Sequence, residues 1–139
     1  MDVRQKFCMW GDTQEKMGVS IPFTGITKSY CSLESAADYF GMPNTVFMNS
    51  MHTWDRVEEN LSFLKKSQQI LCGLPHGAAN AVEGAGKISR LSLKFPRIRG
   101  IVMDDFLQLS GHPTTPELVQ DIRQELRSAN PELELYVVM

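Results

Sequence analysis

Short apolar segments, rich in β-branched and aromatic residues, recur five times along this chain of 139 residues, and they constrain its fold more than any other feature. Segments of this kind are typical of β-strands. Helical patterns separate them, and such an alternation predicts a parallel sheet with right-handed crossovers, that is, an α/β fold. We expect strands over residues 6–10, 45–48, 69–72, 99–104 and 133–139.

Three of the four intervening segments carry clear helix signals. Ser32 is a suitable N-cap for the first helix, and Gly41 is a suitable stop. Thr53 is a candidate cap of the second helix, and Thr115 followed by Pro116 is typical of the start of the last one. The apolar faces of the second and last helices would hold Val57, Leu61, Leu64, Leu118, Val119, Ile122 and Leu126.

The third helical region, residues 78–93, is the weakest of the four. It contains Gly84 and Gly86, and glycine is a poor helix former, so we expect the region to be broken into two pieces. Its glycines and lysine superficially resemble the end of a phosphate-binding loop. Ala81 stands at the position of the first glycine of that motif and Ile88 at the position of its Ser or Thr, so no nucleotide site is predicted.

Two architectures fit this order of elements. The first is the N-terminal part of a (βα)8 TIM barrel, in which residues 1–139 form a single α/β domain cut after its fifth strand. The second is a five-stranded, doubly wound open sheet. A repeat of roughly thirty residues per βα unit suits a barrel, and the chain ends inside a strong strand pattern. We therefore expect the barrel, whose open sheet edges would make this chain aggregate or dimerise.

Composition excludes several classes of function. A formal net charge of −2 and a pI near 5.9 leave no basic surface for nucleic acid. No apolar run is long enough to cross a membrane, and the N-terminus does not read as a signal peptide, so a cytoplasmic location is the default. Cys8, Cys31 and Cys72 form no CxxC pair, and we expect them to be reduced. No glycine-rich dinucleotide motif follows the first strand, and no cofactor is expected.

The fourth predicted strand ends in two adjacent carboxylates, Asp104 and Asp105. Ionised Asp is rarely buried without a partner, so the pair should lie where the strand leaves the core. Ligands bind at the carboxyl ends of strands in α/β folds, which makes both residues catalytic candidates. Consecutive strand residues point to opposite sides, so we expect Asp104 to face the site and Asp105 to hold a neighbouring loop.

Other polar and aromatic residues also follow the predicted strands, and all three histidines of the chain are among them. We take them as substrate-binding candidates: Trp10, Asp12, Asn49, His52, Trp54, His76 and His112. His and carboxylate are common metal ligands, but these residues have no HxH or HExxH spacing, so no metal site is predicted.

The stretch Gly100-Ile101-Val102-Met103-Asp104-Asp105-Phe106 resembles the fourth-strand motif of (βα)8 glycoside hydrolases. It is similar in rhythm to the chitinase-type motif Asp-Gly-x-Asp-x-Asp-x-Glu, in which Asp104 matches the last Asp. Val102 and Phe106 replace the middle Asp and the acidic Glu, so chitinase chemistry is not expected. The resemblance implies a carbohydrate-active barrel. Such a glycoside hydrolase would use a carboxylate at a strand end to act on an oligo- or polysaccharide.

Two other functions stay open at this point. One is a non-catalytic α/β domain that binds a small ligand or a partner protein, and the other is a metal-dependent hydrolase or lyase. Within the carbohydrate hypothesis, the tryptophans would stack on a sugar face, while Asn49 and His76 would bind hydroxyls. The second carboxylate that glycoside hydrolysis needs would come from Asp12 or from strands beyond the fifth.

Overall fold

The computed structural model describes residues 3–11, 32–48, 56–74, 78–104 and 114–138, and in them strands and helices alternate. The α/β class predicted from the sequence is confirmed. The elements are the 3-10 helix η1 (Val3–Lys6), β1 (Cys8–Gly11), α1 (Leu33–Phe40), β2 (Asn44–Phe47), α2 (Val57–Phe63), β3 (Gln69–Gly73), α3 (Ala78–Lys94), β4 (Ile98–Met103), α4 (Pro116–Leu126) and β5 (Glu134–Val137).

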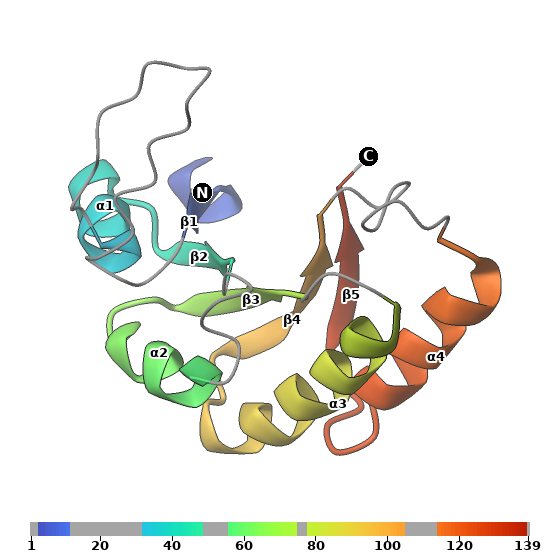
Figure 1. Cartoon of the computed structure of the whole chain (residues 1–139). Helices are drawn as coiled ribbons and strands as arrows, with labels where there is room; N and C mark the ends of the chain where they lie inside the picture. The colour runs from blue at the N-terminus through green and yellow to red at the C-terminus, as the bar shows by residue number, and fades with distance from the viewer. Residues whose placement is uncertain (1–2, 12–31, 49–55, 75–77, 105–113, 139) are drawn as a thin grey trace.

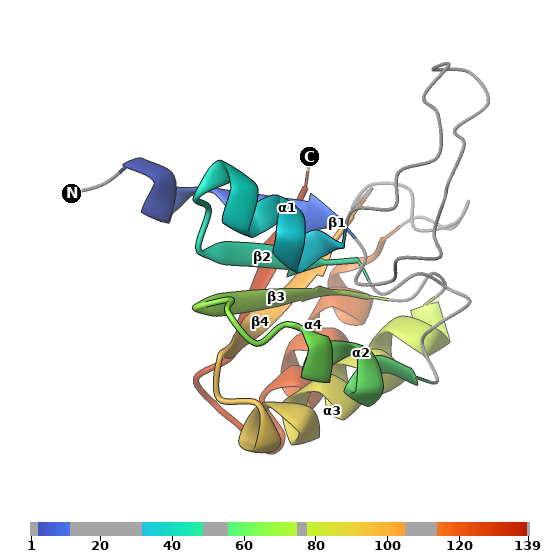
Figure 2. The ribbon, with the colours of Figure 1, turned by 90° about the vertical axis from the view of Figure 1, so that its left-hand side faces the viewer.

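The five strands form one sheet in the order β1-β2-β3-β4-β5, and every neighbouring pair is parallel. When consecutive strands are added in one direction, right-handed crossovers put all the connecting helices on the same side of the sheet. Figure 1 shows this arrangement, with α1 to α4 following the outer side of a curved sheet. Figure 2, turned by 90°, shows α2, α3 and α4 together below β3.

A single hydrophobic core lies between the sheet and the helices. It takes alternate residues from the strands and at least one side chain from each of the four helices. Its members include Leu33, Phe47, Val57, Leu61, Ile70, Cys72, Ala81, Ala85, Ile88, Ile101, Met103, Ile122 and Leu126. Val46 and Val102 are only 5% and 4% exposed but do not belong to this core. They lie on the other side of the sheet, which we call the concave face.

The predicted caps of α1 and α4 are confirmed. The Ser32 side chain accepts a hydrogen bond from the Ser35 N–H at 3.1 Å, and Gly41 ends α1 in the left-handed conformation, with φ 64°. At α4, the Thr115 hydroxyl accepts from the Leu118 N–H at 3.2 Å. Both helices therefore begin where a local sequence signal satisfies an otherwise unpaired N–H group.

The second helix buries the face that its sequence predicts. Val57, Leu61 and Leu64 are all buried in the core. Its predicted cap, Thr53, lies outside the described residues.

The prediction of a broken third helix is wrong, because α3 is continuous over Ala78–Lys94. Gly84 and Gly86 are both buried in it. This helix packs along α4, and the atom nearest to a Cβ at Gly86 would be Glu125 Oε2 of α4, at 2.9 Å. Tertiary packing therefore outweighs the low helix propensity of glycine here.

The predicted first strand, residues 6–10, is shifted. Val3–Lys6 form η1, and β1 starts at Cys8. The Phe7 N–H donates to the Arg4 carbonyl at 3.2 Å, and the Asn44 side chain donates to the Gln5 carbonyl at 2.7 Å. The other four strands agree with prediction to within one or two residues at each end.

Candidate functional site

The carboxyl ends of the strands lie along one margin of the sheet, which we call the carboxyl edge. Gly11, Phe47, Cys72, Ile101 and Leu135 pair successively across the five strands. Main-chain hydrogen bonds continue the pairing just past the strand ends, for example from the Met48 N–H to the Gly11 carbonyl at 2.8 Å. Loops that leave β1 and β4 therefore start from the same side of the molecule.

Trp10 lies on the concave face next to this edge. Its neighbour Met9 packs against the core, and Gly11 approaches Leu33 of α1, so the intervening side chain points away from the helices. Trp10 pairs with Val46 of β2, and it is 45% exposed. A large aromatic surface is thus available to a ligand on the concave face.

Asp104 directly follows β4 in a half-buried turn, which confirms the prediction that the strand leaves the core at this residue. The two residues before it alternate as expected for a strand. Met103 belongs to the core, and Val102 lies on the concave face. Asp104 itself lies in the turn that follows, at the carboxyl end of a strand whose neighbouring residues alternate between the two faces.

Three polar groups on the concave face were not among the predicted site residues. In β5 the Tyr136 hydroxyl donates a hydrogen bond to the Glu134 carboxylate. This bond, followed by partial burial and by the charges of Glu134 and Cys8, raises the pKa of Tyr136 to about 12. Burial of its thiol also raises the pKa of Cys8, although the residue as a whole is exposed. The alternating pattern of residues 133–138 placed Glu134 and Tyr136 on one face, but it did not indicate which one.

The sheet is curved, and the helices lie on its outer side (Figure 1). Cys8 belongs to β1 and Tyr136 to β5, the two outermost described strands. In a flat sheet, four strand spacings of about 4.8 Å would separate them by about 19 Å, beyond the range at which such charges act strongly. The curvature brings the two outer strands closer together than this, and the charge of Cys8 makes the smallest of the contributions that raise the pKa of Tyr136.

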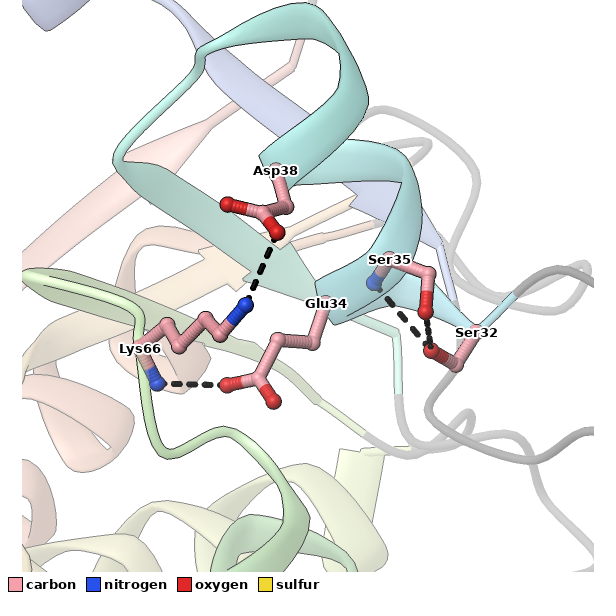
Figure 3. Close-up of polar contacts among 5 residues, drawn as sticks. All are labelled: Ser32, Glu34, Ser35, Asp38 and Lys66. Atoms are coloured by element: carbon pink, nitrogen blue, oxygen red, sulfur yellow. Dashed lines mark hydrogen bonds and ion pairs between the residues drawn. The ribbon is translucent and has the colours of Figure 1, made fainter.

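A cavity of about 230 Å³ lies at the opposite margin of the sheet, between the end of α1 and the segment before β3. Figure 3 shows its polar contacts: Lys66 Nζ forms an ion pair with Asp38 at 2.8 Å, and the Lys66 N–H donates to Glu34 at 2.5 Å. The hydrogen bond to Asp38 raises the pKa of Lys66. These side chains are well exposed, so the pair contributes little stability, and the amino ends of parallel strands seldom bind substrates. We assign this cavity a structural role.

Of the nine predicted site residues, the structure describes Trp10 and Asp104, and both are at the carboxyl edge. The other seven, Asp12, Asn49, His52, Trp54, His76, Asp105 and His112, lie outside the described residues. Within residues 3–11, 32–48, 56–74, 78–104 and 114–138, no three His, Cys, Asp or Glu side chains gather into a metal site. Cys8 and Cys72 are free thiols, and Cys31 lies outside the described residues.

Comparison of this chain with protein-family models, with curated proteins and with solved structures finds no match. Among the helices of the described residues, none is long and apolar enough to span a membrane.

Proposed function

We propose that this chain forms a barrel-type α/β protein that acts on carbohydrate. It would be a glycoside hydrolase for an oligo- or polysaccharide, and Asp104 would be one of the two carboxylates that the enzyme uses. The observation that carries the proposal is the position of Trp10 and Asp104, which both lie at the carboxyl edge, where barrel enzymes bind their substrates. The sequential order of the parallel strands and the position of the helices along the outer side of the curved sheet support a barrel-type arrangement.

The chemistry assigns separate tasks to the two residues. An exposed indole binds the apolar face of a sugar ring by stacking, and Trp10 offers such a surface. A carboxyl group at the strand end can act as acid, base or nucleophile at the glycosidic bond, and Asp104 would take one of these roles. The reaction needs a second carboxyl group, for which Asp12, two residues after Trp10, is the candidate in this chain.

Sugar binding is tested with a panel of oligosaccharides and the intrinsic fluorescence of the chain. We expect saturable quenching or enhancement that Trp10→Phe reduces, with Trp54→Phe as the matched variant for the second predicted tryptophan. A panel without effect on emission would contradict the proposal. Quenching by zinc or manganese in its place would favour the metal-dependent hydrolase or lyase.

Catalysis is tested by comparing Asp104→Asn with Asp105→Asn on an oligosaccharide that binds. Asp104→Asn should abolish turnover and leave the melting temperature nearly unchanged, because functional carboxylates are seldom optimised for stability. Asp105→Asn should cost about 1–3 kcal/mol of stability if it removes a buried hydrogen bond. The assignment fails if Asp104→Asn retains activity but melts early, or if Asp105→Asn alone is inactive at full stability.

A further inference from the structure

Met48 directly follows β2 at the carboxyl edge, and its side chain lies over Gly73 of β3. Cys72 and Leu74, on either side of Gly73, both belong to the core, so Gly73 itself faces the concave side. A Cβ built at Gly73 would lie 2.8 Å from Met48 Sδ and 3.1 Å from Met48 Cε. The thioether on the concave face therefore occupies the space that a side chain at Gly73 would need.

Met48 lies between the two residues on which the proposed function depends. On one side, Trp10 of β1 is in register with β2 two residues before Met48. On the other side, Gly73 pairs with Val102 of β4, and that strand leads directly into Asp104. In the order of the strands, the Met48 side chain thus lies between the proposed stacking residue and the proposed carboxylate.

The surface that these strands present to a ligand is apolar. Met48 is half-buried, and it is not one of the described side chains that pack against the hydrophobic core. Trp10 is 45% exposed, whereas Val46 and Val102 are only 5% and 4% exposed. Of these four residues, a ligand would therefore touch mainly Trp10 and Met48. A thioether is flexible and polarisable, so it adapts to the shape of the group that it contacts.

We propose that Met48 is a specificity-determining residue of the carbohydrate site. Together with Trp10 it forms an apolar floor for a sugar ring near Asp104, and Gly73 leaves the room that the Met48 side chain needs. This role rests on the carbohydrate function proposed above.

An apolar floor selects sugars by the direction of their hydroxyl groups. Pyranose rings with equatorial hydroxyls carry only C–H groups on both faces, and such a face is removed from water on the floor. An axial hydroxyl would be buried there without a hydrogen bond, at a cost in affinity. The floor therefore favours a chain of glucose type over a chain of mannose type.

The test is the binding of cello-oligosaccharides and manno-oligosaccharides to the whole chain, measured by titration calorimetry. The wild type should prefer the cello-oligosaccharides. Met48→Ala should raise their Kd about tenfold, the effect of losing a methylene-sized apolar contact, and should reduce the preference. Met48→Leu returns an apolar side chain of similar volume and should restore most of the affinity. Circular dichroism establishes that each variant is folded.

Gly73→Ala tests the same contact from β3. The added Cβ would displace the Met48 side chain, so this substitution should also weaken binding of cello-oligosaccharides. Combined with Met48→Ala it should have little further effect, because the side chain that it displaces is already absent. If Gly73→Ala does not fold, the two Met48 variants decide.

The role of Met48 is refuted if Met48→Ala binds cello-oligosaccharides as tightly as the wild type, or if Met48→Leu binds as weakly as Met48→Ala. Equal affinity of the wild type for the two sugar series would refute the selection by hydroxyl direction. When Trp10→Phe weakens sugar binding and Met48→Ala does not, only the role of Met48 fails. When the wild type binds no oligosaccharide, the proposed function fails and the role of Met48 fails with it.

Discussion

Gly100 lies in the centre of β4, the strand that leads to Asp104. Substitution at Gly100 is the sharpest test of how closely β4 packs against β5. A Cβ added at Gly100 would lie 2.0 Å from the carbonyl oxygen of Glu134 and 2.8 Å from its carbonyl carbon. Real Cβ contacts are rarely shorter than 3.0 Å. The obstacle is main chain of the paired strand β5, so no side-chain rotation can relieve it. We therefore expect Gly100→Ala to destabilise the fold strongly.

The size of the effect follows from the movement required. Shifting β5 by about 1 Å would stretch hydrogen bonds of about 2.9 Å beyond a useful length. Two such bonds, at about 1 kcal/mol each, together with the strain of overpacking, give a loss of about 3 kcal/mol in the free energy of unfolding. For a chain of this length that corresponds to a fall of about 10 °C in Tm. Urea and thermal denaturation followed by circular dichroism measure both quantities.

Gly86 of α3 is the matched control, because the same substitution meets a different obstacle there. The nearest atom to a Cβ at Gly86 is Glu125 Oε2, at 2.9 Å, the mobile end of a side chain. Alanine is also a better helix former than glycine by about 1 kcal/mol. Gly86→Ala should thus be neutral or stabilising. The reasoning fails if Gly100→Ala costs less than about 1 kcal/mol, or if both substitutions have the same effect.

Two further predictions concern buried polar groups. Ser89 is fully buried, and its hydroxyl accepts hydrogen bonds from two main-chain N–H groups after α4, at 3.0 and 3.3 Å. Ser89→Ala should therefore cost about 2 kcal/mol in urea denaturation, whereas Ser128→Ala, at an exposed hydroxyl of the same region, should change stability by less than about 0.5 kcal/mol. Cys72 is fully buried, which raises the pKa of its thiol to about 12, so an alkylating reagent should modify Cys8 in the folded protein and Cys72 only on unfolding. Because the unfolded chain releases the Cys72 proton near its ordinary pKa and the folded chain does not, stability should fall as the pH rises from about 9 toward 12, and Cys72→Ala should make that fall shallower. Equal alkylation of both thiols in the folded state would contradict this account.

Local signals in the sequence were sufficient for the α/β class and for most element ends. A cap such as Ser32 or Thr115 acts on N–H groups two or three residues away, so its effect is present in the sequence itself. The apolar pattern of β4 and the carboxylate after it likewise placed Asp104 at the exit from the core. These features depend only on neighbours along the chain.

Other features depend on which segments meet in space. Whether Gly84 and Gly86 break α3 was decided by the close packing of α4 against that helix. Lys6, expected to begin the first strand, instead ends η1, and the Gln5 carbonyl of this 3-10 helix accepts a hydrogen bond from the side chain of Asn44, far along the chain.

For the side chains of the concave face, too, one part of the arrangement follows from the sequence and another part only from the tertiary structure. Alternation in the sequence puts Glu134 and Tyr136 of β5 on the same side of the sheet as each other. By the same alternation, Trp10 of β1 must face one of the two sides. It does not state that these are the same side, or that Cys8 acts on Tyr136. That follows from the strand order, the parallel register and the curvature of the sheet. These are set by the packing of four helices on one face, and no local segment encodes them.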